Sequence, residues 1–325
     1  MSRPRELAIA FQTDKRPDEY RELARVVEDY GFDVLSMYSD LTFQPPIVPL
    51  TIAALATSRM RLGPASLNPY TLHPIEIAGQ IATLDMASNG RAYLGISRGA
   101  WLDAVGVAQD RPVSRVVDAL RAVKHLLAGE TAAFEGETFS MRPDVRLRYG
   151  RERDEVPMML GAWGPRLIAA AAPYVDEIKL GGSANPAMAQ VARERLGGAD
   201  CGIVFGAVTV VDEDGGQARA AVKREMALYL PVVAPLDPTV AVEPELLERI
   251  ERLVREDGVE AAGRQISDDL VQKFALAGTP AEITEQCLAL FHAGATRVEF
   301  GTPHGVETAA GLRLLGREVV SLVRS

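Results

Sequence analysis

The sequence predicts a (β/α)8 barrel. Short apolar runs typical of strands alternate with longer amphipathic segments typical of helices, and eight such runs can be counted. This alternation indicates a parallel sheet, because parallel neighbours need a crossover between them. A chain of 325 residues suits one domain of this kind over residues 1–325, and no repeating period indicates a solenoid.

The first half of the chain supplies four strands and the helices that join them. The strands are expected over residues 6–11, 33–38, 62–67 and 92–96. Helices are expected over residues 17–30, 45–56 and 74–88, where Pro opens all three and a Gly lies just beyond two of them. Each helix therefore returns the chain to the start of the next strand.

The second half keeps the alternation but contains two insertions. A helix over residues 114–127 precedes an insertion near 130–155, which holds a hairpin over 134–139 and an exposed charged stretch. Strands five to eight are expected over residues 156–160, 177–180, 201–211 and 297–300, and helices over 217–230, 279–293 and up to 323. Between them, residues 231–267 alternate proline-rich loop with charged helix and contain no strand. The insertions therefore follow strands four and seven.

Composition limits the classes of function. The chain is 47% apolar and 24% charged, as expected of a globular protein with a large core. Its net charge of −9 argues against nucleic acid as a partner. No apolar run is long enough to span a membrane and no signal peptide is apparent, so a cytoplasmic location is expected. Cys201 and Cys287 lie in apolar patterns without metal-ligand spacing and are expected to be buried thiols.

The stretch over residues 62–103 carries the most specific motifs. It reads as strand, loop, helix and strand, and ends in the glycine-containing loop 95–99. Its landmarks are Leu62-Gly63-Pro64, Asn68-Pro69-Tyr70-Thr71, Pro74, Thr83-Leu84-Asp85, Ser88, Gly90-Arg91 and Leu94-Gly95-Ile96.

These landmarks, in this order, resemble the bacterial luciferase-like superfamily, and within it the branch that uses the deazaflavin coenzyme F420, in particular the methylenetetrahydromethanopterin reductases. The resemblance implies a TIM barrel of the luciferase-like type with comparable insertions, in agreement with the periodicity. It also implies F420 as the cofactor, held at the C-terminal ends of the strands. No metal is expected, because deazaflavins transfer hydride.

Asp40 ends the second predicted strand. From position alone it could be a helix N-cap or a loop carboxylate. The resemblance implies instead an acid that faces the cofactor and is a catalytic candidate. The family's neighbouring His is replaced here by Leu41.

The loops after strands three and four hold further cofactor candidates. The resemblance implies a non-prolyl cis peptide between Ala65 and Ser66, against the deazaflavin, although an ordinary trans loop remains open from the sequence. Asn68 is either a turn residue or an amide that reaches the cofactor. The other candidates in these loops are Ser97, Gly99 and Asp103.

Two glycine-containing loops are expected to hold the phosphate and the neighbouring wall. Free backbone amides at a strand-to-helix turn attract phosphate, and Arg166 adds positive charge. The residues are Gly161, Ala162, Trp163, Gly164, Pro165 and Arg166, with Gly181, Gly182 and Ser183 as the wall.

The family's acids are absent at two further positions. Ala10 occupies the place of the acid on strand one, and Ala100 and Trp101 follow Gly99 where an acid is usual. The remaining candidates for proton transfer or for the substrate pocket are His73, Asp40, Asp103, Glu299 and His304, although a lone His is more often a satisfied loop residue. Trp101 and Trp163 are expected to form an apolar wall at the mouth, with Trp101 in the substrate pocket.

The sequence therefore predicts an enzyme that transfers hydride between F420 and a small organic substrate other than methylenetetrahydromethanopterin. Two alternatives stay open: a monooxygenase that uses FMN, and a non-catalytic F420-binding protein. A homodimer is expected from the resemblance, with the apolar segments 50–56 and 75–86 at its interface.

Overall fold

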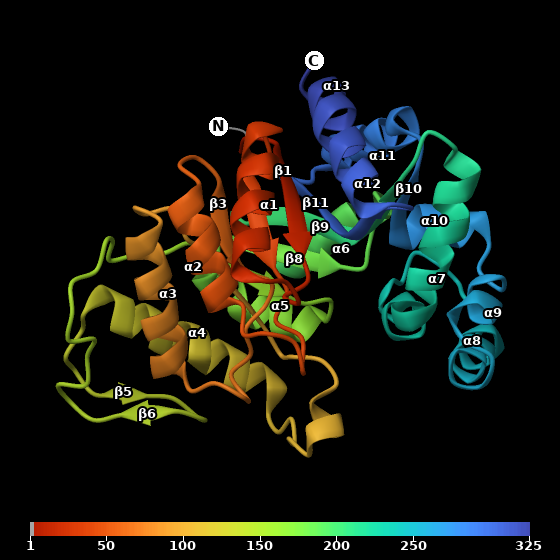
Figure 1. Cartoon of the computed structure of the whole chain (residues 1–325). Coiled ribbons are helices and arrows are strands. Elements are labelled where there is room, and N and C mark those ends of the chain that lie inside the picture. The colour runs from red at the N-terminus through yellow and green to blue at the C-terminus, as the bar shows by residue number, and fades with distance from the viewer. Residues whose placement is uncertain (1–2) are drawn as a thin grey trace.

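The computed structural model describes residues 3–325, which form a nearly closed barrel of eight parallel strands (Figure 1). Hydrogen-bonded neighbours follow the order β3-β2-β1-β11-β9-β8-β7-β4, and isolated bridges such as Leu62 to Ala92 join the two ends. The strands are β1 (Glu6–Phe11), β2 (Val34–Met37), β3 (Arg61–Pro64), β4 (Leu94–Ser97), β7 (Met158–Gly161), β8 (Glu177–Gly181), β9 (Gly202–Val211) and β11 (Arg297–Gly305). The predicted fold class is confirmed.

Helices surround the barrel wall (Figure 1). They are α1 (Pro17–Asp29), α2 (Ile47–Ala56), α3 (Pro74–Ala87), α4 (Pro112–Ala128), α5 (Pro165–Ala171), α6 (Ala187–Leu196), α7 (Gly215–Val233), α11 (Pro280–Ala293), α12 (Thr308–Leu314) and α13 (Val320–Arg324). Their boundaries follow local chemistry. In α11, for example, Thr279 and Glu282 cap each other's backbone amides and Gly294 ends the helix in the left-handed conformation.

The insertion after β4 lies beyond α4. It contains a two-stranded antiparallel hairpin of β5 (Phe134–Glu135) and β6 (Ser140–Met141), which projects at the lower left of Figure 1. The second arm had been expected to end at Phe139. It starts one residue later, because Thr138 instead donates its backbone amide to the carboxylate of Asp118 on α4, at 2.8 Å.

The insertion after β9 forms a helical lobe on the opposite side of the barrel from α3 and α4 (Figure 1). It comprises α7 with α8 (Pro244–Glu256), α9 (Val259–Gly263) and α10 (Asp268–Phe274). One strand there is not predicted by the sequence: β10 (Ala275–Gly278), which pairs in parallel with the C-terminal half of β9. Its four apolar residues follow α10 without a turn signal, so the pattern resembled the end of a helix.

The last strand is longer than expected. The sequence predicts a strand that ends at Phe300. The pairing with β9 instead resumes at His304 after an irregularity that contains the cis peptide Thr302–Pro303. Glu299 is therefore the third residue of a nine-residue strand and not its end.

The main hydrophobic core lies between the outer face of the barrel and the helices. It includes side chains from alternate strand positions, such as Leu7, Ile9 and Phe11 on β1, and from the inward faces of the helices. A second core joins α7 to the helices of the insertion after β9. No helix within residues 3–325 meets the length and hydropathy that a membrane span requires.

Candidate active site at the barrel mouth

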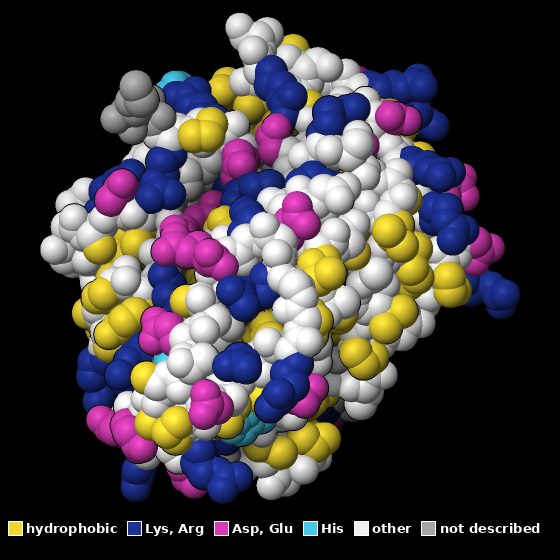
Figure 2. Space-filling model, turned by 90° about the vertical axis from the view of Figure 1, so that its left-hand side faces the viewer, with side chains coloured by type: hydrophobic (Ala, Val, Ile, Leu, Met, Phe, Trp, Pro, Cys, Tyr) yellow, Lys and Arg dark blue, Asp and Glu magenta, His cyan; other side chains and the backbone are white. Residues whose placement is uncertain are grey.

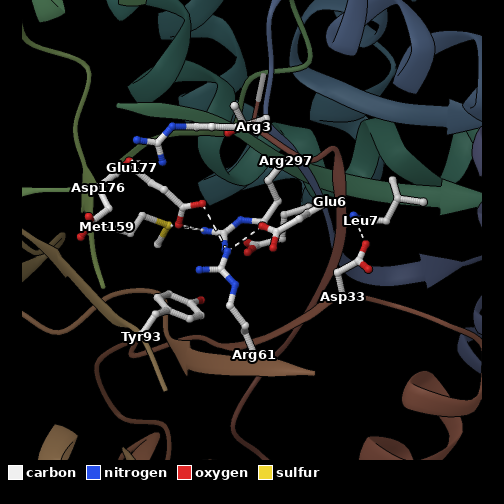
Figure 3. A network of polar contacts seen from close by, with 12 residues as sticks. Arg3, Glu6, Leu7, Asp33, Arg61, Tyr93, Met159, Asp176, Glu177 and Arg297 are labelled. Atoms are coloured by element: carbon white, nitrogen blue, oxygen red, sulfur yellow. Dashed lines mark hydrogen bonds and ion pairs between the residues drawn. The ribbon is translucent and has the colours of Figure 1, made fainter. Parts of the chain in front are cut away.

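The N-terminal end of the barrel is closed by ion pairs that are partly or fully buried (Figure 3). Arg61 lies 2.6 Å from a carboxylate oxygen of Glu6 and 3.3 Å from one of Glu177, and Arg297 lies 3.1 Å from the other oxygen of Glu177. The Arg297 guanidinium also lies 5.1 Å from the centre of the Tyr93 ring. This end of a barrel contributes to stability, whereas the other end carries chemistry.

A dry apolar layer lies above these ion pairs. Inward positions recur every second residue along a strand, and they bring Ala8, Met159 and Val204 together with Val34 and Tyr93. All five side chains are fully buried. Water therefore cannot reach the barrel interior from the N-terminal end.

Charged groups reappear in the next layer. Ser36 on β2 donates its hydroxyl to Oε2 of Glu299 on β11 at 2.5 Å, and Lys179 on β8 pairs with Oε1 of the same carboxylate. The Ser36 hydroxyl also lies 2.7 Å from the hydroxyl of Tyr93. Burial by itself would raise the pKa of Glu299, but the charges of Lys179 and Arg297 outweigh burial and hold this pKa below its usual value.

Only small side chains stand between this charged layer and the mouth on four of the strands. They occupy the inward positions two residues beyond the dry layer, on β1, β7 and β9, and the matching position after β3. The residues are Ala10, Ala65, Gly161 and Gly206. The other strands contribute Tyr38, Ser97, Gly181 and Gly301 above the charged layer. Of these, Ala65, Ser97, Gly161 and Gly181 are partly exposed and form the floor of the mouth beside the ring of Tyr38, whereas Ala10, Gly206 and Gly301 are buried beneath it.

Asp40 lies in the loop after β2 and is not a helix cap, since α2 begins only at Ile47. Its carboxylate accepts a hydrogen bond from Nε2 of Gln12 at 2.8 Å. The Oε1 atom of Gln12 in turn accepts from the backbone amide of Thr13 at 2.9 Å. The loops after the first two strands are thereby fixed to each other at the mouth.

The loop after β3 has the conformation that the resemblance implied. The Ala65–Ser66 peptide is cis. A Cβ on Gly161 would lie 3.3 Å from Oγ of Ser66 and 3.3 Å from Cβ of Ser97, so the three predicted residues adjoin. Of the two readings of Asn68, the turn is present: its Oδ1 accepts from the amides of Tyr70 and Thr71 at 3.1 and 2.9 Å.

The loop after β4 packs against this turn. Gly99 has a φ of +87°, and a Cβ there would lie 3.1 Å from the side chain of Asn68. The Ser97 hydroxyl accepts the Gly99 amide at 3.3 Å. Beyond Gly99, Trp101 and Asp103 are exposed around a short 3-10 helix, η1 (Leu102–Val105).

The two glycine loops after β7 and β8 are joined by Trp163, which donates its indole N–H to the carbonyl of Gly181 at 3.1 Å. The ring also packs against the main core, so it is not the open aromatic wall that we had expected. Gly164 precedes α5, and no side chain caps that helix. The exposed Arg166 has no ion pair or hydrogen bond to any residue in 3–325.

The predicted wall after β8 is partly structural. Gly182, with a φ of +81°, lies against α7, where a Cβ would meet Val233 at 3.1 Å. Ser183 is fully buried, and its hydroxyl accepts the amide of Asn185 at 3.3 Å. Gly181 is different, since a Cβ there would meet open space.

Three side chains that the sequence places at the site lie away from the mouth: His73, Glu299 and His304. His73 is exposed and caps α3, because its Nδ1 accepts the amide of Ile75 at 3.2 Å. Glu299 lies inside the barrel below the mouth, since the strand continues past it. His304 is fully buried against Phe11, with Nε2 3.1 Å from the carbonyl of Ala10, and burial lowers its pKa to about 4.

Sequence reasoning missed Lys179, Tyr38 and Gln12. Lys179 stands in the predicted strand over residues 177–180, at a position that alternates with Ile178 and Leu180. In a barrel whose outer face packs on helices, this alternation points the lysine into the interior. That signal was present in the sequence.

The chain matches the family model for luciferase-like monooxygenases over residues 4–297. It belongs to the luciferase-like monooxygenase family. The 5,10-methylenetetrahydromethanopterin reductase of Archaeoglobus fulgidus is 29% identical over 96% of this chain and 98% of its own length. An F420-dependent glucose-6-phosphate dehydrogenase of Nakamurella multipartita is 32% identical over 49% of this chain and 51% of its own length.

Solved structures agree on the fold of this family. The F420-dependent tetrahydromethanopterin reductase of Methanopyrus kandleri superposes with a TM-score of 0.88 at 24% identity, covering 98% of this chain and 99% of its own. An F420-dependent secondary alcohol dehydrogenase gives 0.79 at 18%, with full coverage of both chains. A Baeyer–Villiger monooxygenase from Pseudomonas putida in complex with FMN gives 0.68 at 16%, covering 98% of each chain. The predicted family and its enzymatic character are confirmed.

Proposed function

We propose that this enzyme transfers hydride between coenzyme F420 and a small organic substrate bound at the barrel mouth. The observation that carries the proposal is the full-length similarity to a reductase of the F420-using branch, described above. The glucose-6-phosphate dehydrogenases that resemble half of the chain are also named as F420-dependent. F420 is therefore favoured over FMN.

The residues at the mouth fit a flat ring with an anionic tail. Ala65 and Gly161 are partly exposed and carry almost no side chain, so a planar ring can approach the backbone there. The bound coenzyme would supply the hydride. The protein would place Asp40 and the Ala65–Ser66 peptide beside the ring, and Asn68, Ser97 and Gly99 would shape the adjoining loops.

The phosphate end of the coenzyme would lie at the loop over residues 161–166. Gly164 exposes backbone there, and a Cβ at this position would meet nothing within 4 Å. Arg166 is exposed and has no partner among residues 3–325, so its charge is available to an anion. This local charge matters because the protein as a whole is acidic and repels anions.

The substrate is proposed to differ from methylenetetrahydromethanopterin. Ala10, Leu41 and Ala100 stand where the resemblance implies acids and a histidine. The exposed Trp101 and Asp103, close to the loop after β4, would border the substrate.

A homodimer is proposed through α2 and α3. Val48 and Leu55 on α2 are 63% and 74% exposed, and Met86 on α3 is 42% exposed, which is unusual for such large apolar side chains. Figure 2, which views the molecule from the left-hand side of Figure 1, shows hydrophobic side chains gathered in a band along its right-hand edge. A second copy of the chain would cover this band.

The test of the function is anaerobic turnover. Purified protein is mixed with reduced F420 and a panel of ketones, aldehydes, imines and activated alkenes, and the oxidised coenzyme is followed by its absorbance. Oxidation that requires both protein and acceptor supports the proposal. Tight F420 binding without turnover of any acceptor would favour the non-catalytic alternative, and oxygen-dependent oxidation with reduced FMN would favour the monooxygenase.

A further inference from the structure

Lys179 is a charged group inside the barrel that solvent still reaches. Its side chain is 9% exposed, although that of its partner Glu299 is 1% exposed and Ser36 is fully buried. The layer beneath it is dry, since Met159 and Val204 are fully buried. The exposed surface of Lys179 must therefore face the mouth.

Small neighbours leave room for this lysine. A Cβ on Gly206 would lie 2.6 Å from Cε of Lys179, so only glycine lets the side chain cross β9 at this height. Above it, the ammonium nitrogen lies 5.9 Å from the centre of the Tyr38 ring. The lysine thus ends between the carboxylate of Glu299 and the floor of the mouth.

The charges around Lys179 define its role. The lowered pKa of Glu299 keeps that carboxylate ionised, so Glu299 holds the ammonium but has no proton of its own to give. Burial, followed by the charges of Glu299 and Asp40, raises the pKa of Tyr38 well above its usual value, so the phenol stays protonated. Arg297 and Tyr93 lie one layer deeper and do not reach the mouth.

Other candidates for proton transfer are engaged or remote. His304 is buried with its Nε2 on the carbonyl of Ala10, and His73 caps α3. Asp40 is held by Gln12, and Asp103 is exposed on η1. Lys179 and the protonated phenol of Tyr38 remain at the floor, and of the two it is Lys179 whose position is fixed by an ionised partner, Glu299.

We propose that Lys179 is the proton donor of this active site, positioned by Glu299, and that the substrate is therefore reduced at a polar double bond, C=O or C=N. As hydride joins the carbon, the π electrons move to the oxygen or nitrogen. The heteroatom forms a bond to a proton of the Lys179 ammonium, whose N–H electrons return to nitrogen. The neutral amine then takes a proton from water at the mouth, and the hydroxide left there is neutralised by the proton that the reduced coenzyme would release as it is oxidised.

This inference rests on the proposed function. Two variants of Lys179 test the role of the lysine separately from the use of F420. Lys179→Arg keeps the positive charge next to Glu299 but cannot release a proton, because a guanidinium stays charged. Lys179→Ala removes the donor and leaves a cavity in which ethylammonium fits. Lys223→Met is the matched control, because Lys223 is a partly buried lysine on α7 that also pairs with a carboxylate, that of Asp268 at 2.6 Å, but lies outside the mouth.

The experiment measures F420 binding by fluorescence titration and turnover on the acceptor panel with reduced F420, for each variant. We expect F420 affinity to change less than threefold in all of them. For ketones or imines, kcat should fall about 10²-fold or more in both Lys179 variants, the loss typical of a missing general acid. Ethylammonium should restore part of the activity of Lys179→Ala and none of that of Lys179→Arg.

Several results would overturn the inference. One is a Lys179→Arg enzyme within threefold of wild type, which would reduce the lysine to an electrostatic role. Another is a wild-type enzyme that reduces C=C bonds of the panel but no C=O or C=N bond. Should Lys179→Ala unfold, the double variant Lys179→Met with Glu299→Gln removes both buried charges together, and it must also lose turnover while it binds F420. Failure of wild type to bind F420 would instead refute the proposed function itself.

Discussion

Trp163 donates its indole N–H to the carbonyl oxygen of Gly181 across 3.1 Å, and so ties the loop after β7 to the loop after β8. Both loops are proposed to contact the coenzyme. The side chain of Trp163 therefore couples the conformations of the two loops.

Replacing this tryptophan tests the connection. Trp163→Phe keeps most of the packing but leaves the Gly181 carbonyl without its donor, so the free energy of unfolding should fall by about 1 kcal/mol, and F420 should bind several-fold more weakly. Chemical denaturation and titration measure the two effects. Trp101→Phe is the control, because its indole is 55% exposed and its loss should change stability by less than about 0.5 kcal/mol. Equal losses in both variants would refute the structural role.

Arg166 tests the phosphate end of the proposed site. Because it is exposed and has no partner among residues 3–325, Arg166→Ala should leave stability unchanged and weaken F420 binding by about tenfold, roughly one charge-assisted contact. The effect should shrink as salt is added, and Arg166→Lys should restore part of the affinity. Arg313→Ala, on the exposed face of α12, should bind F420 like wild type. An Arg166→Ala enzyme with undiminished affinity at low salt would remove this arginine from the site.

His304 should make stability depend on pH. Its pKa is about 4 when folded, because burial disfavours the charge, and near 6.5 when unfolded. The unfolded chain therefore binds more protons between these values, so stability is complete above pH 6.5 and decreases as pH falls toward 4, by about 3 kcal/mol in total. Denaturant unfolding at pH 7, 6 and 5 measures the slope. His304→Gln can still donate a hydrogen bond to the carbonyl of Ala10. Above pH 5, where carboxylates contribute little, this variant should show a smaller change of the free energy of unfolding with pH. An unchanged dependence on pH would mean that His304 is not buried as a neutral ring.

The proposed dimer predicts the effect of a charge on α2. Leu55→Glu places a carboxylate at a position that is 74% exposed in the single chain, so a monomer should tolerate it. In gel filtration the wild type should elute as a dimer of the 35.0 kDa chain and the variant as a monomer, with the unfolding midpoint of the isolated monomer little changed. Glu251→Gln on α8, a similarly exposed position far along the chain, should not alter the elution of the dimer. A wild type that elutes as a monomer would refute the dimer.

The alternation of apolar runs was enough to predict the eight barrel strands, because each strand packs its outer face on a helix and must be apolar there. It did not predict β10. This strand has four residues and pairs only with the C-terminal part of β9, and so short an apolar run after a helix cannot be told from the end of that helix. It also stopped β11 at Phe300, because the sequence cannot show that pairing resumes beyond Pro303.

The positions of candidate residues could be predicted where these residues directly follow a strand. Asp40 and Asn68 lie in loops that follow strands, Gly161 ends β7, and the cis peptide at Ala65–Ser66 is present, whereas their contact with a coenzyme stays a prediction. Glu299 and His304 were expected at the end of a strand, but their depth depends on how far the strand continues. Lys179 was overlooked because a charged residue in a strand normally indicates solvent, whereas here the partner that permits its burial lies 120 residues away.

Equilibrium titration of the purified protein with F420, and separately with FMN, tests the central claim most directly. The intrinsic fluorescence of Trp101 and Trp163 reports binding, with free tryptophan as the control for optical absorption by the ligand. We expect saturable binding of F420 at micromolar concentration or better, and FMN binding at least about tenfold weaker. Preferential binding of FMN would move the enzyme to the oxygen chemistry of its family, and binding of neither would contradict the assignment of the mouth as a cofactor site.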